Sequence, residues 1–242
     1  MGLKLSWVRK LLPPLLFVGG CVAAAVYFVE NPGSAMAARV LTYDHLAVLA
    51  VQHVSMVVIS SLLATATALP LGILISRPRL RLLGLVLENL VNIGQTIPSI
   101  AVIALSFTVL GLGFNTALFA LWLYSLLPIL RNTYAGIMSV PEGVREAAVG
   151  MGMRPWRVLL RIELPLAFPI IMAGIRTAVV VNVGTATLAT FIGAGGFGHL
   201  IVTGIVVRRL QLLLTGCILS ALLAMLCDHL LGMVEDKVRA ST

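Results

Sequence analysis

Side chains that commonly bind metals or act as nucleophiles are few in this sequence, and they lie far apart. The histidines are His45, His53, His199 and His229, and the cysteines are Cys21, Cys217 and Cys227. The histidines have no H-E-x-x-H spacing, and each cysteine lies in an apolar run, where a free thiol behaves as a small buried hydrophobic side chain. No Gly-x-Ser-x-Gly element is present to activate a serine. We therefore expect no metal site and no catalytic residue.

One glycine-rich segment has the letters of a nucleotide-binding motif. Residues 193–198 read Gly-Ala-Gly-Gly-Phe-Gly, which fits G-x-G-x-x-G. A dinucleotide site needs a strand before this motif and a helix and an acidic residue after it, and we predict none of these here. The chain also lacks the G-x-x-x-x-G-K-[ST] loop that binds ATP phosphates. We interpret residues 193–198 as a flexible turn outside the membrane, with a docking protein as its candidate contact, and expect no cofactor in this chain.

The composition indicates that any functional residue is positioned by elements that lie in a membrane. Of the 242 residues, 60% are hydrophobic and 11% are charged, whereas soluble domains carry about 25% charged residues. Such a chain needs an apolar solvent, which a lipid bilayer supplies. The net charge of +8 could suggest nucleic-acid binding. However, the basic residues form short tracts between apolar runs, as in membrane proteins, so we expect no nucleic-acid partner.

We expect six membrane-spanning helices and therefore an all-α integral membrane protein. The first apolar run extends from Leu11 to Val29, long enough to cross a bilayer core of about 30 Å. Its basic flank is similar to a secretory signal, and residues 18–21 resemble a lipoprotein cleavage site, but the run continues past Cys21, so we interpret it as an uncleaved span. The further spans are Leu46–Ser76, Leu82–Leu112, Thr116–Met138, Leu166–Ile192 and Leu210–Met233.

The basic residues predict that both termini face the cytoplasm. Twelve lysines and arginines at the termini and between spans then lie inside, and only Arg39, Arg208 and Arg209 lie outside, as the positive-inside rule requires. We accordingly divide the chain into a cytoplasmic segment, first span and external loop (1–45), a transmembrane domain (46–233) and a cytoplasmic tail (234–242). This tail is short, so we expect any solute-binding protein to be a separate chain.

The longest predicted cytoplasmic segment, residues 139–165, joins the fourth and fifth spans and should form a helix–turn–helix projection. Ser139 is suited to cap its first helix, and Pro141 suits the first turn. A second short helix should begin at Arg154, which precedes a proline. Small residues in this segment should leave a flat face for another protein, and they are Ala147, Ala148, Gly150 and Gly152.

The spacing in this segment resembles the EAA signature of bacterial ABC-importer permeases. The matching positions are Glu146-Ala147-Ala148, three residues, Gly152, nine residues, and then Ile162-x-Leu164-Pro165. In that family, the loop forms a coupling helix that seats in a groove of the cytoplasmic ATPase. The resemblance implies a type I ABC importer permease fold and, as partner, an ATPase dimer that binds ATP and Mg. It places at the ATPase contact Glu146, Ala147, Ala148 and Gly152, supported by Arg154 and Arg157.

Further segments resemble the permeases of osmoprotectant importers, which carry glycine betaine, choline and related quaternary ammonium solutes. These segments are 95–99 (Gln-Thr-Ile-Pro-Ser), 126–134, 173–177 and 184–189, and the similarity extends from about Gln52 to Gly232. The resemblance implies a second permease subunit, homologous or identical, and a periplasmic or extracellular solute-binding protein. It also implies the bacterial inner membrane as location, with membrane lipid around the spans.

Polar residues inside the spans are the candidates for the translocation path, because polar groups in hydrocarbon need a cavity or a partner. Pro98 should interrupt the third span. Broken helices can border a water-filled path, so the residues near this break are either path-lining or beside a kink that only aids packing. In the fifth span, helix packing by small residues is the alternative. The path candidates are Asn92, Gln95, Thr96, Ser99, Asn182, Thr185 and also Thr187.

The charged residues inside the spans are more suited to interhelical ion pairs than to binding a cation. Arg131 and Arg176 are the cations, and Glu88 and Asp228 are their candidate counter-charges. An ion-coupled secondary transporter or channel is the alternative function, but it would favour inverted repeats or more membrane carboxylates. An intramembrane protease is a second alternative, which the missing nucleophile motif disfavours.

Overall fold

The computed structural model describes residues 2–77 and 80–239, with side chains throughout this part except at 2–11, 81, 85, 88 and 239. Five helical segments are long and apolar enough to cross a membrane, and a bent helix pair brings the number to six if it counts as one span. The five are α1 (Gly2–Glu30), α3 (Tyr43–Ile75), α6 (Phe114–Met138), α11 (Leu210–Arg239), and residues Pro155–Ile192, which include α9 (Leu164–Ala186). The predicted all-α architecture of about six spans is confirmed.

The bent pair is the predicted third span, which breaks where Pro98 was expected to break it. α4 (Arg81–Gly94) ends one turn before the proline, and α5 (Ser99–Leu110) begins directly after it. The two axes differ in direction by 98°. Proline lacks a backbone N–H and disfavours helical geometry at the preceding residue, which explains why the helix ends here.

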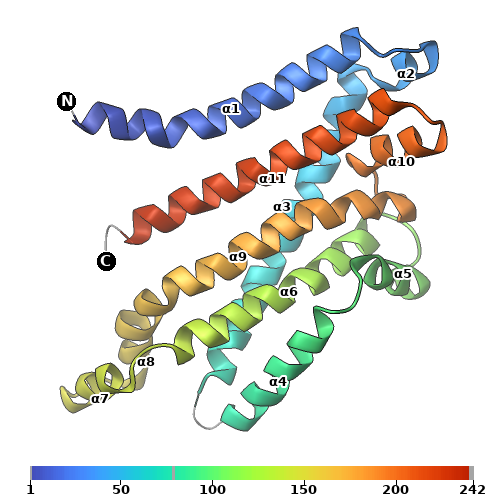
Figure 1. The fold of residues 1–242 in the computed structure, drawn as a ribbon. Coiled ribbons are helices and arrows are strands. Elements are labelled where there is room, and N and C mark those ends of the chain that lie inside the picture. Colours follow the sequence, from blue (N-terminus) through green and yellow to red (C-terminus); the bar gives the residue numbers. More distant parts are fainter. Residues whose placement is uncertain (1, 78–79, 240–242) are drawn as a thin grey trace.

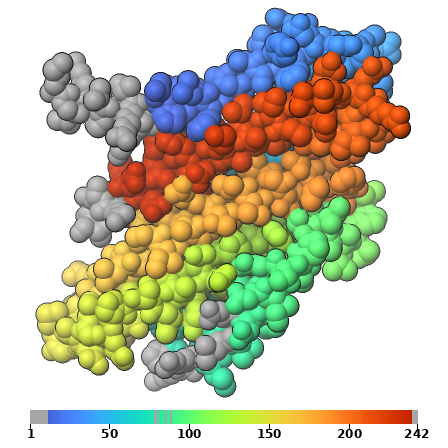
Figure 2. Space-filling view, in the orientation of Figure 1, coloured from blue at the N-terminus to red at the C-terminus, as the bar shows by residue number. Residues whose placement is uncertain are grey.

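Figure 1 shows α1, α11, α9 and α6 side by side in that order, with α3 crossing behind them. The short helices α2 (Ala35–Val40) and α10 (Gly198–Val206) lie at one end of this bundle. At the other end are α7 (Glu142–Gly150) and α8 (Pro155–Val158), together with the start of α1 and the end of α11 (Figure 1). In the space-filling view, α11, α9 and α6 form adjoining bands across one face (Figure 2).

Small residues allow α3, α6 and α9 to approach closely. A Cβ atom added at Gly72 of α3 would lie 2.6 Å from Thr133 Cβ of α6. A Cβ atom at Gly174 of α9 would lie 2.5 Å from Asn132 Cβ, also on α6. Lipid tails are as apolar as leucine, so close van der Waals packing of this kind, rather than the hydrophobic effect, holds membrane helices together.

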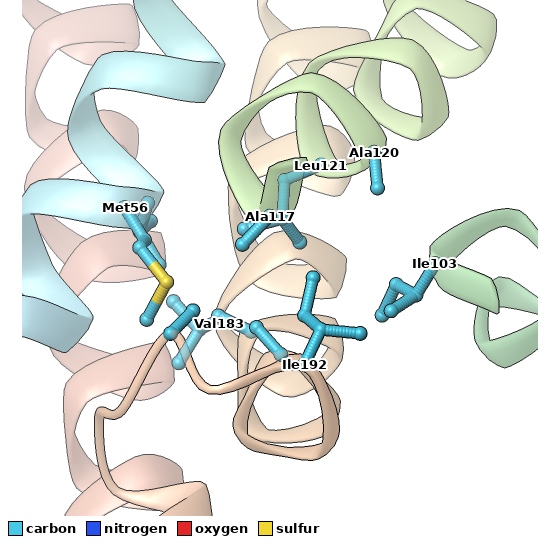
Figure 3. Close-up of a cluster of buried hydrophobic side chains, with 11 residues drawn as sticks. Met56, Ile103, Ala117, Ala120, Leu121, Val183 and Ile192 are labelled. Carbon is cyan, nitrogen blue, oxygen red and sulfur yellow. The ribbon is translucent and has the colours of Figure 1, made fainter. Parts of the chain in front are cut away.

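A cluster of buried apolar side chains joins four elements near the end of the bundle that carries α10. Figure 3 shows Met56 of α3, Ile103 of α5, Leu121 of α6 and Ile192 converging. Ile192 belongs to a 3₁₀-helical turn, Thr187–Ile192, that continues α9, so the predicted fifth span is helical to its end although its last turn is tighter. Through this cluster, the broken span α4–α5 is attached to the other helices.

Many large apolar side chains point away from the interior. Val51 of α3 is 69% exposed and Leu105 of α5 is 66% exposed, as expected for helices surrounded by lipid or by another subunit. The expectation of buried cysteines is wrong for Cys217, which is exposed, while Cys21 and Cys227 are half-buried. A thiol on a spanning helix needs no protein around it when lipid covers it.

Candidate functional site

The segment between α6 and α9 forms the predicted helix–turn–helix projection. α7 ends in a turn in which Gly152 has φ 79° and its N–H donates to Val149 O, while Met153 N–H donates to Ala148 O. These two hydrogen bonds form a Schellman motif, in which glycine is favoured because other residues are strained at positive φ. α8 and a π-helical turn, Leu159–Glu163, then lead into α9. Gly152 therefore sets the direction in which the chain leaves α7.

The predicted cap of the first loop helix is wrong. Ser139 lies at the C-terminal end of α6, and its hydroxyl donates to Gly136 O. Pro141 occupies the N-cap position of α7, without a side-chain cap. A serine between two helices can cap either one, and in this chain α6 extends far enough for Ser139 to be its C-cap residue.

The four small residues predicted to form one flat face are divided by the structure. Ala147, Gly150 and Gly152 are exposed, whereas Ala148 is 1% exposed. Ala148 therefore packs α7 against the rest of this chain, and the prediction that its side chain contacts another protein is corrected.

The exposed surface of the loop combines apolar and charged side chains. Val149 is 60% exposed, Met151 74% and Trp156 55%. Glu146, Arg154 and Arg157 are also exposed, and the Arg157 guanidinium lies 5.4 Å from the centre of the Trp156 ring. Clustered large apolar side chains with a charged rim are typical of a surface that binds another protein.

A buried carboxylate that the sequence analysis overlooked lies beneath this loop. Glu163, in the π-helical turn, has a side chain 7% exposed. Its Oε2 accepts a hydrogen bond of 2.8 Å from Arg77 Nη2, and its Oε1 lies 3.1 Å from Arg145 Nε. Arg145 also donates from Nη2 to Ile137 O in the last turn of α6. The cluster thus contacts the ends of α3 and α6, the helix α7 and the start of α9.

At the opposite end of the bundle, the glycine-rich segment 193–198 is a packed turn. Gly196 N–H donates to Gln52 Oε1 of α3 at 3.1 Å. A Cβ atom at Gly198 would lie 1.8 Å from Thr187 O, so only glycine fits there. The prediction of a flexible turn is therefore corrected, because the segment is hydrogen-bonded to α3 and packed against the end of α9.

His53, which the sequence analysis left without a role, holds the same turn. It is completely buried and stacks on Phe197, with ring centres 4.9 Å apart. Phe197 N–H donates to His53 Nδ1 at 3.3 Å, and His53 Nε2 lies 3.1 Å from Val183 O in α9. A neutral ring with its proton on Nε2 satisfies both contacts, since Nδ1 then accepts and Nε2 donates. His53 therefore joins α3, α9 and the turn.

The path candidates separate into an exposed group and a buried group. Asn92, Gln95 and Thr96 at the break between α4 and α5 are exposed, and Ser99 is half-buried. Asn182 is completely buried, and its Nδ2 donates to Ser60 Oγ at 2.7 Å and to Ser61 Oγ at 3.2 Å. Thr185 is 7% exposed, whereas Thr187 is half-buried. In this structure, Asn182 and Thr185 therefore lie in the packed interface between helices, as the alternative to a path-lining role predicts.

The predicted interhelical ion pair forms for one arginine. Arg176 of α9 donates two hydrogen bonds of 2.8 and 2.9 Å from Nη2 to the carboxylate of Asp228 in α11, and its Nη1 lies 3.2 Å from Glu235 Oε2. Arg131 is exposed and forms no ion pair with the described side chains, and the side chain of Glu88 lies outside the described set. Among those same side chains, no three His, Cys, Asp or Glu residues are grouped to hold a metal ion.

Comparisons with known proteins give the family. Residues 68–240 match the model of the binding-protein-dependent transport system inner membrane component. The chain is 46% identical to the carnitine transport permease protein OpuCD of Listeria monocytogenes, over 76% of this chain and 82% of that protein. It is 44% identical to the osmoprotectant import permease protein OsmY of Salmonella typhimurium, over 79% and 81%. It is 45% identical to the glycine betaine/carnitine/choline transport system permease protein OpuCD of Bacillus subtilis, over 76% and 80%.

The fold is also found in a solved structure. The inward-facing MetNI methionine ABC transporter contains a chain that matches 81% of this one over 96% of its own length, with a TM-score of 0.67 and 24% identity. Transporters of this kind receive their solute from a binding protein, and their ATP is bound by a partner ATPase rather than by the permease. The chain belongs to the family of binding-protein-dependent transport system inner membrane components and is a multi-pass permease subunit of a bacterial ABC importer.

Proposed function

We propose that this permease imports osmoprotectants of the glycine betaine, choline and carnitine class. The observation that carries the proposal is the 44–46% identity to permeases named for these solutes, over 76–79% of the chain. The exposed polar residues at the break of α4–α5 are uncharged, which suits the passage of a quaternary ammonium solute without tight binding. We assign Asn92, Gln95, Thr96 and Ser99 to the translocation path.

The importer that we propose contains two permease subunits, an ATPase dimer and a periplasmic or extracellular solute-binding protein. Two permeases of one named Bacillus subtilis system, OpuCD and OpuCB, are 45% and 41% identical to this chain. This similarity to both favours a second permease that is homologous to this one.

We propose that both termini and the α7–α8 loop face the cytoplasm. The twelve basic residues on that side support this orientation. The beginning of α1, the end of α11 and the loop also lie at one end of the bundle (Figure 1).

In this orientation, the exposed surface of α7 contacts the ATPase. Glu146 and Ala147 lie on it, Gly152 lies in the turn that follows it, and Arg154 and Arg157 flank it. The exposed Val149 and Met151 add the apolar area that a stable protein contact needs.

Solute uptake tests the function. The chain would be expressed with a second permease, an ATPase and a solute-binding protein of the same importer, in a host without osmoprotectant transporters. Accumulation of radiolabelled glycine betaine, choline or carnitine is expected, with methionine as the control solute. Uptake that persists after the ATPase is inactivated would instead favour ion-coupled transport, and uptake of methionine alone would refute the proposed solute class.

A further inference from the structure

We propose that Glu163 is a positioning residue that clamps the coupling helix α7 to the spanning helices, so that a displacement of α7 moves α3, α6 and α9 together. The inference rests on the proposed contact between α7 and the ATPase. It assigns to one buried side chain the transmission of movement from that contact into the membrane.

The clamp depends on a single carboxylate shared by two arginines. Arg77 lies just past the end of α3 and Arg145 lies in α7, and each uses a different oxygen of Glu163. No other described carboxylate is within ion-pair distance of either arginine. Loss of Glu163 therefore leaves both guanidinium groups, which are 31% and 27% exposed, without a counter-charge. Buried and partly buried ion pairs fix relative positions because separating them leaves an uncompensated charge.

The cavity around these ion pairs explains why they matter for the position of α7. A cavity of about 750 Å³ lies between the loop and the spans, and Arg77, Arg145 and Glu163 all line it. Direct packing across this space is limited, with Ala148 as the buried residue of α7. The polar cluster bridges the cavity, since Arg145 also donates to Ile137 O of α6. Glu163 stands in a π-helical turn, an irregularity that often occurs at functional sites.

A direct test measures whether α7 stays docked in the isolated chain. Ala148→Cys, in a background without the three native cysteines, would be labelled with a membrane-impermeant maleimide in detergent. Because Ala148 is buried, slow labelling is expected, and Glu163→Gln should accelerate it at least about tenfold. The control is Glu142→Gln, since Glu142 is exposed, lines the same cavity and has no ion pair among the described side chains. Equal labelling rates in Glu163→Gln and the control would overturn the clamp, whatever the solute.

A second test measures transmission in the assembled transporter. In proteoliposomes holding the complete complex, we expect Glu163→Gln to retain ATP hydrolysis while glycine betaine imported per ATP falls at least about fivefold. Arg77→Gln, which breaks only the connection to α3, should produce a smaller fall and serves if Glu163→Gln does not assemble. Normal import per ATP in both variants would refute the inference. Absence of uptake by the unmodified complex would instead refute the proposed solute, and the labelling test would still decide the clamp.

Discussion

Gly174 gives the sharpest test of how the helices beside the loop are packed. The substitution Gly174→Ala would place a methyl carbon 2.5 Å from Asn132 Cβ and 3.0 Å from Pro128 O. Carbon atoms in contact lie about 3.5–4.0 Å apart. The substitution therefore requires α6 and α9 to separate locally by about 1 Å, or α9 to rotate away from α6.

The expected cost follows from two opposing effects. Inserting a methyl group into a closely packed contact costs about 1–3 kcal/mol. Alanine in place of glycine inside a helix recovers up to about 1 kcal/mol. We expect a net loss of about 1–2 kcal/mol in the free energy of unfolding, which corresponds to a decrease in Tm of roughly 2–8 °C for a chain of this length.

The matched control lies on the same helix. Gly184 is exposed, and a Cβ atom there meets no other atom within 4 Å. Gly184→Ala should therefore leave Tm unchanged or raise it slightly. Both variants would be heated as isolated chains in detergent, with folding followed by tryptophan fluorescence and size-exclusion chromatography. Equal Tm values for the two variants would refute the argument that close contact at Gly174 holds α6 to α9.

Two further predictions concern the loop and the ion pair. Ala147→Trp adds bulk to the exposed face of α7 without contacting the rest of this chain. Tm should therefore be unchanged, while the affinity for the ATPase falls on the order of tenfold, or about 1.4 kcal/mol. A pull-down titration measures this affinity, and an unchanged value would place the contact elsewhere. Arg176→Gln and Asp228→Asn, measured singly and together by unfolding in detergent, should show a coupling energy of about 1 kcal/mol, as is usual for a polar contact between two membrane helices. Strictly additive effects would show that this ion pair does not stabilise the fold.

The spans, the break at Pro98 and the helical loop could be predicted because each depends on local sequence. Apolar runs of sufficient length can be recognised along the chain, and Pro98 removes a backbone donor within one of them. Proline alone does not decide the break, because α3, α6 and α9 continue through Pro70, Pro128 and Pro169. Gly152 ends the first loop helix, because few other residues adopt its backbone conformation. The cap at Ser139 was wrong because α6 ends and α7 begins within one turn of it, and the extent of each helix depends on tertiary packing.

Glu163 and His53 could not be assigned because their partners are distant in sequence. Arg77 is 86 residues before Glu163, and Phe197 is 144 residues after His53. A local signal did exist for Glu163, which is the only acidic residue between Glu146 and Asp228. It also lies four residues before the buried Ala167, so it continues the buried face of α9 by one turn. An acidic residue on such a face needs a cation or hydrogen-bond donors beside it, and the helical spacing already indicates this need.

The polar clusters at the two ends of the bundle join the same pair of helices. At one end, His53 of α3 contacts Val183 of α9, and at the other Arg77 beyond α3 contacts Glu163 before α9. Next to Val183, Asn182 of α9 donates to Ser60 of α3. Polar contacts near both ends of α9 resist sliding of one helix along the other, because each would lose its partner in an apolar medium. On the proposal above, a force applied at the loop reaches the opposite end of the bundle through α3 and α9 as a unit, while α5 is joined to them by the apolar cluster that contains Ile103.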